Sequence, residues 1–180
     1  EFYKYDGKVL AGAFNVETGE VEYFDKDKLD EKNTILKASC SIPLLFPFVK
    51  IGDKYYADGG LSNPIPIYKS IEDGNDKNII VLTRNIDYRK KKSKANQLAY
   101  KVYKKKYPKL AEVLSKRHIE YNKEVEFCNQ LENKGEAIVL RPTIPMNIGR
   151  FERDKVKLRN IYDNGYNLVI ENKEKILGFL

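Results

Sequence analysis

One carboxylate in the sequence stands where proteins of mixed strands and helices place reacting groups. Asp58 ends the apolar run Tyr55–Ala57 and is followed by Gly59 and Gly60. Glycine at such positions permits a positive φ and the close approach of another backbone, and α/β proteins bind ligands beyond the carboxyl ends of their strands. A plainer interpretation stays open, because Asp-Gly is a common turn pair in which the carboxylate accepts hydrogen bonds from nearby amides.

The other candidate bases and nucleophiles lack a catalytic context. His118 is the only histidine, so a Ser-His-Asp triad would have to use it, but we expect it on a helix surface among basic neighbours. Ser39 and Ser41 are near Asp58 in sequence, yet neither lies in a strand-to-helix elbow, and we expect Ser39 to bond to the backbone at a helix end. No cluster of His, Cys, Asp and Glu has the spacing of metal ligands, so we predict no catalytic metal.

Length, hydropathy and cysteine usage limit the class of protein. The chain has 180 residues, of which 42% are hydrophobic and 12% aromatic, so we expect one ordered domain. Cys40 and Cys128 form no CxxC pair, which fits a reducing, cytoplasmic compartment. No apolar run approaches the roughly 20 residues of a membrane-spanning helix, and residues 1–6 have no features of a secretory signal.

The net charge of +7 is concentrated in residues 84–118, which contain 13 Lys or Arg and only two acids. The simplest interpretation is a solvated helix face. Two functional interpretations also remain: docking at an anionic membrane surface, with the protein peripheral to it, and binding to a nucleic-acid backbone. Nucleic acid is the least favoured partner, because no known nucleic-acid-binding module is recognisable.

Hydrophobic periodicity and turn residues outline the elements that must position Asp58. Alternating or continuous apolar runs predict strands, steps of three or four residues predict helices, and prolines and glycines mark their ends. The predicted strands are residues 9–14, 21–24, 49–51, 54–57, 78–83 and 137–140. The predicted helices are residues 35–38, a short helix after Pro66, two helices separated by Pro108, and one begun by Asp154 that Gly165 ends or bends.

Strands and helices follow one another along most of the chain, which predicts an α/β fold. We expect the first two strands to form a hairpin, and the next two to form another. The apolar, β-branched run at residues 78–83 is typical of a central parallel strand. We therefore expect a mainly parallel sheet flanked by helices.

The segment around Asp58 resembles the region around the catalytic Asp of patatin-like phospholipases. In that family an Ala-Ser-x-x-x-Pro stretch, an aromatic-Pro pair, a short hairpin, Asp-Gly-Gly and Asn-x-Pro follow in this order. The matching parts of this sequence are Ala38–Pro43, Phe46-Pro47, the second predicted hairpin, Asp58–Gly60 and Asn63-Pro64. Residues 139–142 and 162–166 are similar to the tail of bacterial members, so the resemblance covers about residues 10–165.

The resemblance implies a serine acyl hydrolase of phospholipids or related acyl esters, with a three-layer α/β fold and no cofactor. In such enzymes an Asp accepts the proton of a Ser held in a Gly-x-Ser-x-Gly elbow, and a Gly-rich loop donates amides to the oxyanion. By position, the Asp of this Ser-Asp dyad is Asp58. The residues that match the supporting part of the motif are Gly59, Gly60, Asn63 and Pro64.

The chain departs from the family pattern at the nucleophile. No two of its eleven glycines are four positions apart, so the Gly-x-Ser-x-Gly elbow is missing, and the Gly-rich oxyanion loop is missing too. We expect residues 1–180 to be the C-terminal portion of a single patatin-like domain whose N-terminal half carries the serine, and to be inactive alone. The alternative is a non-catalytic lipid-binding or regulatory module that retains the fold without the nucleophile.

Overall fold

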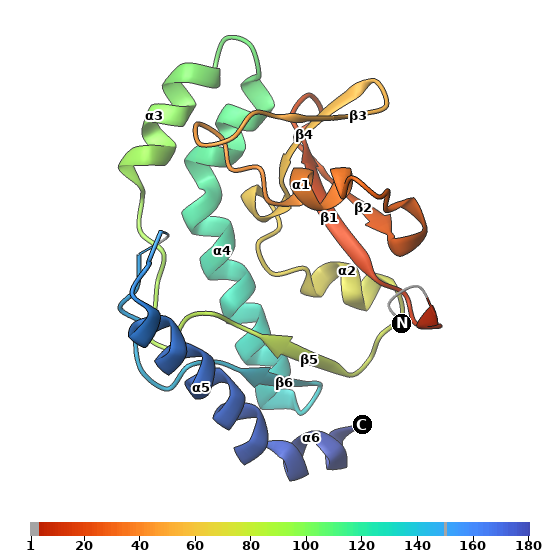
Figure 1. The fold of residues 1–180 in the computed structure, drawn as a ribbon, viewed down its shortest axis with the longest axis vertical. Coiled ribbons are helices and arrows are strands. Elements are labelled where there is room, and N and C mark those ends of the chain that lie inside the picture. The colour runs from red at the N-terminus through yellow and green to blue at the C-terminus, as the bar shows by residue number, and fades with distance from the viewer. Residues whose placement is uncertain (1–3, 150) are drawn as a thin grey trace. The chain divides into compact units, whose positions relative to one another are not determined.

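The computed structural model describes residues 4–149 and 151–180, and Figure 1 shows their helices and strands. The chain forms two compact units. The first consists of Glu1–Ile65 and Lys90–Lys123, and the second of Pro66–Arg89 and Glu124–Leu180. Asp58 and the helical part of the basic segment therefore belong to the first unit.

A four-stranded antiparallel sheet forms the centre of the first unit. Its strands are β1 (Leu10–Asn15), β2 (Val21–Asp25), β3 (Val49–Ile51) and β4 (Lys54–Asp58), in the order β2-β1-β4-β3. Glycines with positive φ, Gly19 at 82° and Gly52 at 60°, turn the two hairpins. Ala13 of β1 pairs with Asp58 of β4, which places the carboxylate at the end of the central strand pair.

Helices complete the first unit at the positions that prolines and cap residues mark. They are η2 (Lys26–Lys28), α1 (Thr34–Ser39), η3 (Gly59–Leu61), α3 (Lys94–Tyr103) and the first part of α4 (Pro108–Lys134). Ser93 caps α3 by accepting a hydrogen bond from the N–H of Asn96. Pro108 begins α4. The first N–H groups of a helix have no partner within it, so the N–H that proline lacks is not needed there.

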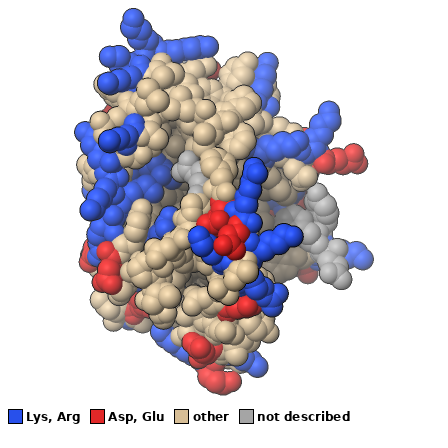
Figure 2. Space-filling model, turned by 60° about the vertical axis from the view of Figure 1, so that its left-hand side comes forward, with Lys and Arg blue, Asp and Glu red and all other residues tan. Residues whose placement is uncertain are grey.

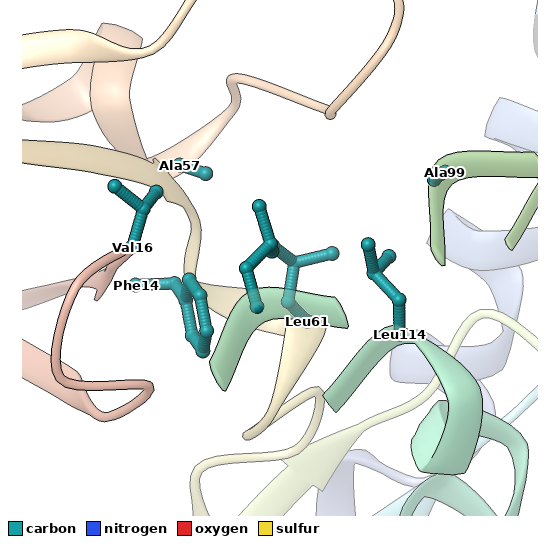
Figure 3. Packing of buried hydrophobic residues seen from close by; sticks show 7 residues of the cluster. Phe14, Val16, Ala57, Leu61, Ala99 and Leu114 are labelled. Carbon is teal, nitrogen blue, oxygen red and sulfur yellow. The ribbon is translucent and has the colours of Figure 1, made fainter. Parts of the chain in front are cut away.

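The core of the first unit joins the sheet to α3 and α4. Phe14, Ala57 and Leu61 from the sheet and η3 pack with Leu110 and Leu114 of α4, and each of these residues is at most 4% exposed. In Figure 3, Leu61 lies between Phe14 and Leu114. Burial of each large apolar side chain contributes roughly 1.5–3 kcal/mol, so this cluster holds both helices against the part of the sheet that carries Asp58.

The second unit contains a two-stranded parallel sheet, β5 (Asn78–Val81) and β6 (Ala137–Leu140). Strand β6 is buried along its whole length, as expected for a parallel strand covered on both faces. Arg141, directly after β6, forms an ion pair with Glu132 at 3.0 Å. The helices of this unit are α2 (Ile67–Glu72), α5 (Lys155–Glu171), α6 (Lys173–Phe179) and the end of α4.

The α/β class is confirmed, but the expectation of a mainly parallel sheet is not met. Among the described strands, β1–β2, β1–β4 and β3–β4 are antiparallel and only β5–β6 is parallel. The physical reason lies in the connections. Short turns at Gly19 and Gly52 force the following strand to return antiparallel, whereas α3 and α4 separate β5 from β6 and allow a parallel pair.

Helix α5 also differs from one of the expected alternatives at Gly165. Asp154 caps the helix as predicted, since its Oδ1 accepts from the N–H groups of Val156 and Lys157 at 2.9 and 3.2 Å. Gly165 lies inside α5, which continues to Glu171 and is separated from α6 by Asn172. A glycine inside a helix costs only about 1 kcal/mol relative to alanine, so Gly165 does not by itself end the helix.

None of the helices in the described part of the chain is long and apolar enough to cross a membrane.

Candidate active site

Asp58 is the last residue of β4 and the N-cap of η3, and its carboxylate is half-buried. Its N–H donates to the carbonyl of Ser41 at 2.9 Å, and its Oδ1 accepts from the N–H of Gly60 at 2.8 Å. Within residues 4–149 and 151–180, Oδ2 accepts no hydrogen bond. Oδ1 thus makes the hydrogen bond expected of an Asp-Gly turn, and the backbone orients it. The other oxygen is available to accept a proton.

The two glycines after Asp58 have different roles. A Cβ on Gly59 would lie 2.4 Å from the carbonyl oxygen of Gly12, so only glycine lets β1 approach the start of η3. A Cβ on Gly60 would lie 3.1 Å from Oδ1 of Asp58 and would press on the carboxylate. Gly59 therefore permits the close packing of the turn against β1. Gly60 has no side chain that would displace the Asp58 carboxylate.

Arg117 of α4 contacts the same turn, and sequence reasoning did not select it as a site residue. Its Nε donates to the carbonyl of Gly60 at 2.8 Å. Hydrogen bonds with a charged donor are stronger than neutral ones, so this contact ties the Asp58–Gly60 turn to α4. A signal was present in the sequence, because Arg117 continues the apolar helical stripe of Leu110 and Leu114, where a cation requires a partner.

Asn63 and Pro64 shape the chain where it leaves the turn. The N–H of Asn63 donates to the carbonyl of Gly59 at 3.2 Å, and its Nδ2 donates to the hydroxyl of Tyr23 on β2 at 2.5 Å. Pro64 follows in a half-buried position. These contacts link the exit of the turn to the sheet, so Asn63 acts on the position of Asp58 through the backbone.

The remaining sequence candidates are engaged elsewhere. Ser41 donates its hydroxyl to the carbonyl of Lys37 at 2.8 Å, so the helix-end hydrogen bond expected of Ser39 is made by Ser41 instead. His118 is half-buried and lines a cavity of about 330 Å³ together with side chains of α3 such as Lys101. Among the described residues, no hydrogen bond links Asp58 to a serine, cysteine or histidine side chain.

Neither cysteine has the environment of a reactive thiol pair. Cys40 is exposed, Cys128 is buried, and both are free. Burial raises the pKa of the Cys128 thiol to about 11, so this thiol stays protonated at neutral pH. In the part of the chain that the structure describes, no three His, Cys, Asp or Glu side chains lie together as metal ligands would.

A polar cluster centred on Glu22 lies on the strands that carry the site. Glu22 accepts hydrogen bonds from Asn15 Nδ2 at 2.8 Å, Lys54 Nζ at 3.0 Å and the Tyr56 hydroxyl at 2.7 Å. Burial acts to raise the pKa of Glu22, but these hydrogen bonds outweigh it and leave the pKa below its usual value. Tyr56 precedes Asp58 by two residues on β4, so this cluster helps to fix the strand that ends at Asp58.

Tyr56→Phe is expected to lower the free energy of unfolding at neutral pH by about 1 kcal/mol, because it removes one donor to Glu22. In the unfolded chain the pKa of Glu22 is near 4.5, and in the folded protein it lies below that value. The stability that this carboxylate contributes is therefore complete above about pH 4.5 and lost as the pH falls through the folded pKa. Urea unfolding should show a larger difference from the parent protein at pH 7 than below pH 4.

The matched control is Tyr55→Phe, which changes the exposed neighbour on the other face of β4. We expect it to leave stability within about 0.5 kcal/mol of the parent protein. A Tyr56→Phe deficit that is the same at both pH values would contradict the assignment to Glu22.

Two family models match different parts of the chain. Residues 6–69 match the family model "Patatin-like phospholipase", and residues 107–180 match a different model, "Domain of unknown function (DUF6363)". No curated protein matches the chain significantly. The resemblance is confirmed over the segment that contains Asp58, Gly59, Gly60, Asn63 and Pro64, whereas residues 139–142 and 162–166 lie in the second match.

Proposed function

We propose that the complete protein hydrolyses lipid acyl esters with Asp58 as the general base of a Ser-Asp dyad, because residues 6–69 match the family model of patatin-like phospholipases. The substrate is a phospholipid or a related acyl ester. The nucleophilic serine comes from a Gly-x-Ser-x-Gly segment outside residues 1–180. These residues are then the C-terminal portion of one patatin-like domain, in which Asp58 meets a serine of the N-terminal half.

The arrangement of the Asp58 carboxylate is the observation that carries this proposal. Oδ1 is oriented by the N–H of Gly60 at 2.8 Å, while Oδ2 has no hydrogen bond within the described residues. A general base needs a fixed orientation and a lone pair within hydrogen-bond reach of the proton it removes. The Asp58 carboxylate meets the first condition. The second condition would be met when the hydroxyl of the proposed serine lies within hydrogen-bond distance of Oδ2.

The proposed reaction uses Asp58 twice. Oδ2 accepts the serine hydroxyl proton while the serine oxygen attacks the ester carbonyl, and the alcohol leaves with that proton. Asp58 then accepts a proton from water as the water attacks the acyl-enzyme, and it returns this proton to the serine oxygen as the fatty acid is released. The hydrogen bond from Gly60 to Oδ1 keeps the carboxylate in one orientation through both steps.

The test is hydrolysis of a medium-chain aryl ester by the complete protein and by its Asp58→Asn variant. Activity that depends on Asp58 supports the dyad. Absence of activity in the folded parent protein would overturn the proposal and favour a non-catalytic lipid-binding or regulatory module.

A further inference from the structure

Three consecutive apolar side chains protrude from the first unit after α1. Leu44, Leu45 and Phe46 are 41%, 46% and 51% exposed. The N–H groups of Leu45 and Phe46 donate to the carbonyl of Ile42 at 3.1 and 3.0 Å, so the turn has a defined shape. Leu44 has a φ of 70°, a left-handed conformation that is unfavourable for a bulky residue. A strained turn that holds apolar side chains in solvent indicates a functional surface.

This Leu44–Phe46 turn is attached to α3. The N–H of Leu44 donates to the hydroxyl of Tyr103 at 3.3 Å. The ring of Phe48, just beyond the turn, lies 5.4 Å from that of Tyr103 and 5.3 Å from that of Tyr107. The turn and the C-terminal end of α3 are therefore parts of one surface of the first unit.

The outer face of α3 continues the same pattern. Leu98 and Val102 are 56% and 54% exposed, while Ala99 is buried in the core. Residues four apart lie on one face of a helix, so Leu98 and Val102 form an apolar stripe. Exposed lysines, Lys101 and Lys105, flank it. Lysine side chains can cover apolar surface with their methylene groups while their ammonium groups reach outward.

The surroundings of this apolar surface are strongly cationic. Within the described residues, no ion pair holds Lys101, Lys104 or Lys105. Figure 2 shows Lys and Arg side chains gathered at the top and upper left of the view, and the connection between α3 and α4 is at the top of Figure 1. The cavity of about 330 Å³ beside α3 is lined by Lys92 and Lys101, so Lys92 adds a further cationic group to this side.

We propose that the Leu44–Phe46 turn and the outer face of α3 form a membrane-docking surface for an anionic bilayer. The apolar side chains enter the boundary between headgroups and acyl chains, and the lysines around them contact anionic headgroups. Apolar exposure alone would also suit a second copy of this chain, but the unpaired lysines would then repel those of the partner. Charge complementarity therefore selects the anionic lipid surface.

The docking surface lies close in sequence and structure to the candidate active site. The turn begins three residues after Ser41, whose carbonyl accepts the N–H of Asp58 at 2.9 Å. The inference thus deepens the proposed function, since it places lipid beside the proposed base. Vesicle binding can be measured without hydrolysis, so the two proposals fail separately.

The test is co-sedimentation of the complete protein with two kinds of vesicle, phosphatidylcholine alone and equal parts phosphatidylcholine and phosphatidylserine. We expect binding to the mixed vesicles, little binding to phosphatidylcholine, and weaker binding as salt rises from about 0.1 M to about 1 M. The variants Leu45→Ser/Phe46→Ser and Lys101→Gln/Lys105→Gln should each weaken binding to mixed vesicles by about tenfold or more.

Matched controls change similar side chains elsewhere. Val169 and Ile170 on α5 are 45% and 53% exposed, so Val169→Ser/Ile170→Ser removes comparable apolar surface. Lys173→Gln/Lys175→Gln removes the same charge from α6. Circular dichroism checks the fold of each variant, and the lysine pair still tests the proposal if the serine pair unfolds.

Four outcomes would overturn the inference. They are absence of vesicle binding, equal binding to both vesicle types, equal losses in the test and control variants, and a dimer in sedimentation analysis that the Leu45→Ser/Phe46→Ser variant abolishes. The last would assign the surface to a second copy. Anionic vesicle binding without ester hydrolysis would overturn the dyad proposal alone.

Discussion

The Asp58→Asn variant of the complete protein is expected to lose about 10²-fold or more of its kcat for ester hydrolysis, the usual scale of general-base catalysis. The asparagine oxygen can still accept the Gly60 N–H that Oδ1 accepts at 2.8 Å. The amide has the same size, so the turn and the packing of Gly59 stay in place. What the substitution removes is the ability to take the serine proton.

The distribution of the effect between kcat and KM separates this role from a structural one. A base that acts on the serine contributes in the transition state, so we expect kcat and kcat/KM to fall together while KM changes little. The matched control is Asp53→Asn, an exposed carboxylate in the β3–β4 turn, which we expect to retain full turnover. Urea unfolding of both variants should match the parent protein.

An Asp58→Asn enzyme that keeps more than about a tenth of the parent kcat would remove Asp58 from the proton transfer. Equal losses in Asp58→Asn and Asp53→Asn would point instead to a general effect of charge or folding.

Gly59→Ala is expected to have the largest effect on stability, with the free energy of unfolding lowered by about 3 kcal/mol, the upper end of the range for overpacked sites. The new Cβ would lie 2.4 Å from the carbonyl oxygen and 2.8 Å from the carbonyl carbon of Gly12. Both atoms belong to the backbone of β1, which cannot move aside as a flexible side chain would. Relief of the clash requires β1 and η3 to separate, and this disturbs the pairing of Ala13 with Asp58.

Urea unfolding of the complete protein measures this effect, and Gly165→Ala is the matched control. Gly165 lies inside α5, and a Cβ there meets nothing within 4 Å. Alanine should therefore stabilise that helix by roughly 0.5–1 kcal/mol. The same change of residue thus has opposite signs at the two positions. An unfolding midpoint of Gly59→Ala equal to that of the parent would refute the close approach of β1 at Gly59.

Local features of the chain could be read from the sequence because they depend on neighbouring residues. Turns at Gly19 and Gly52, the start of α4 at Pro108 and the cap at Asp154 all appear where their residue types require them. The order of motifs around Asp58 likewise identified the patatin-like segment, which the match of residues 6–69 confirms. The turns, the helix start and the cap each rest on interactions within a few residues along the chain, and the motif order is itself a property of the sequence.

Contacts between distant parts of the chain needed the tertiary structure. The antiparallel order β2-β1-β4-β3 joins two hairpins through β1 and β4, and no local pattern specifies that pairing. Arg117 reaches Gly60 across 57 positions of sequence, and Tyr56 reaches Glu22 across 34. Their partners become neighbours only when α4 and β2 pack beside β4. The candidate base and the Gly60 N–H that orients it could therefore be expected from the sequence. The distant groups that hold its turn and its strand, Arg117 and Glu22, were brought there by folding, since burial and hydrogen bonding select partners by distance in space.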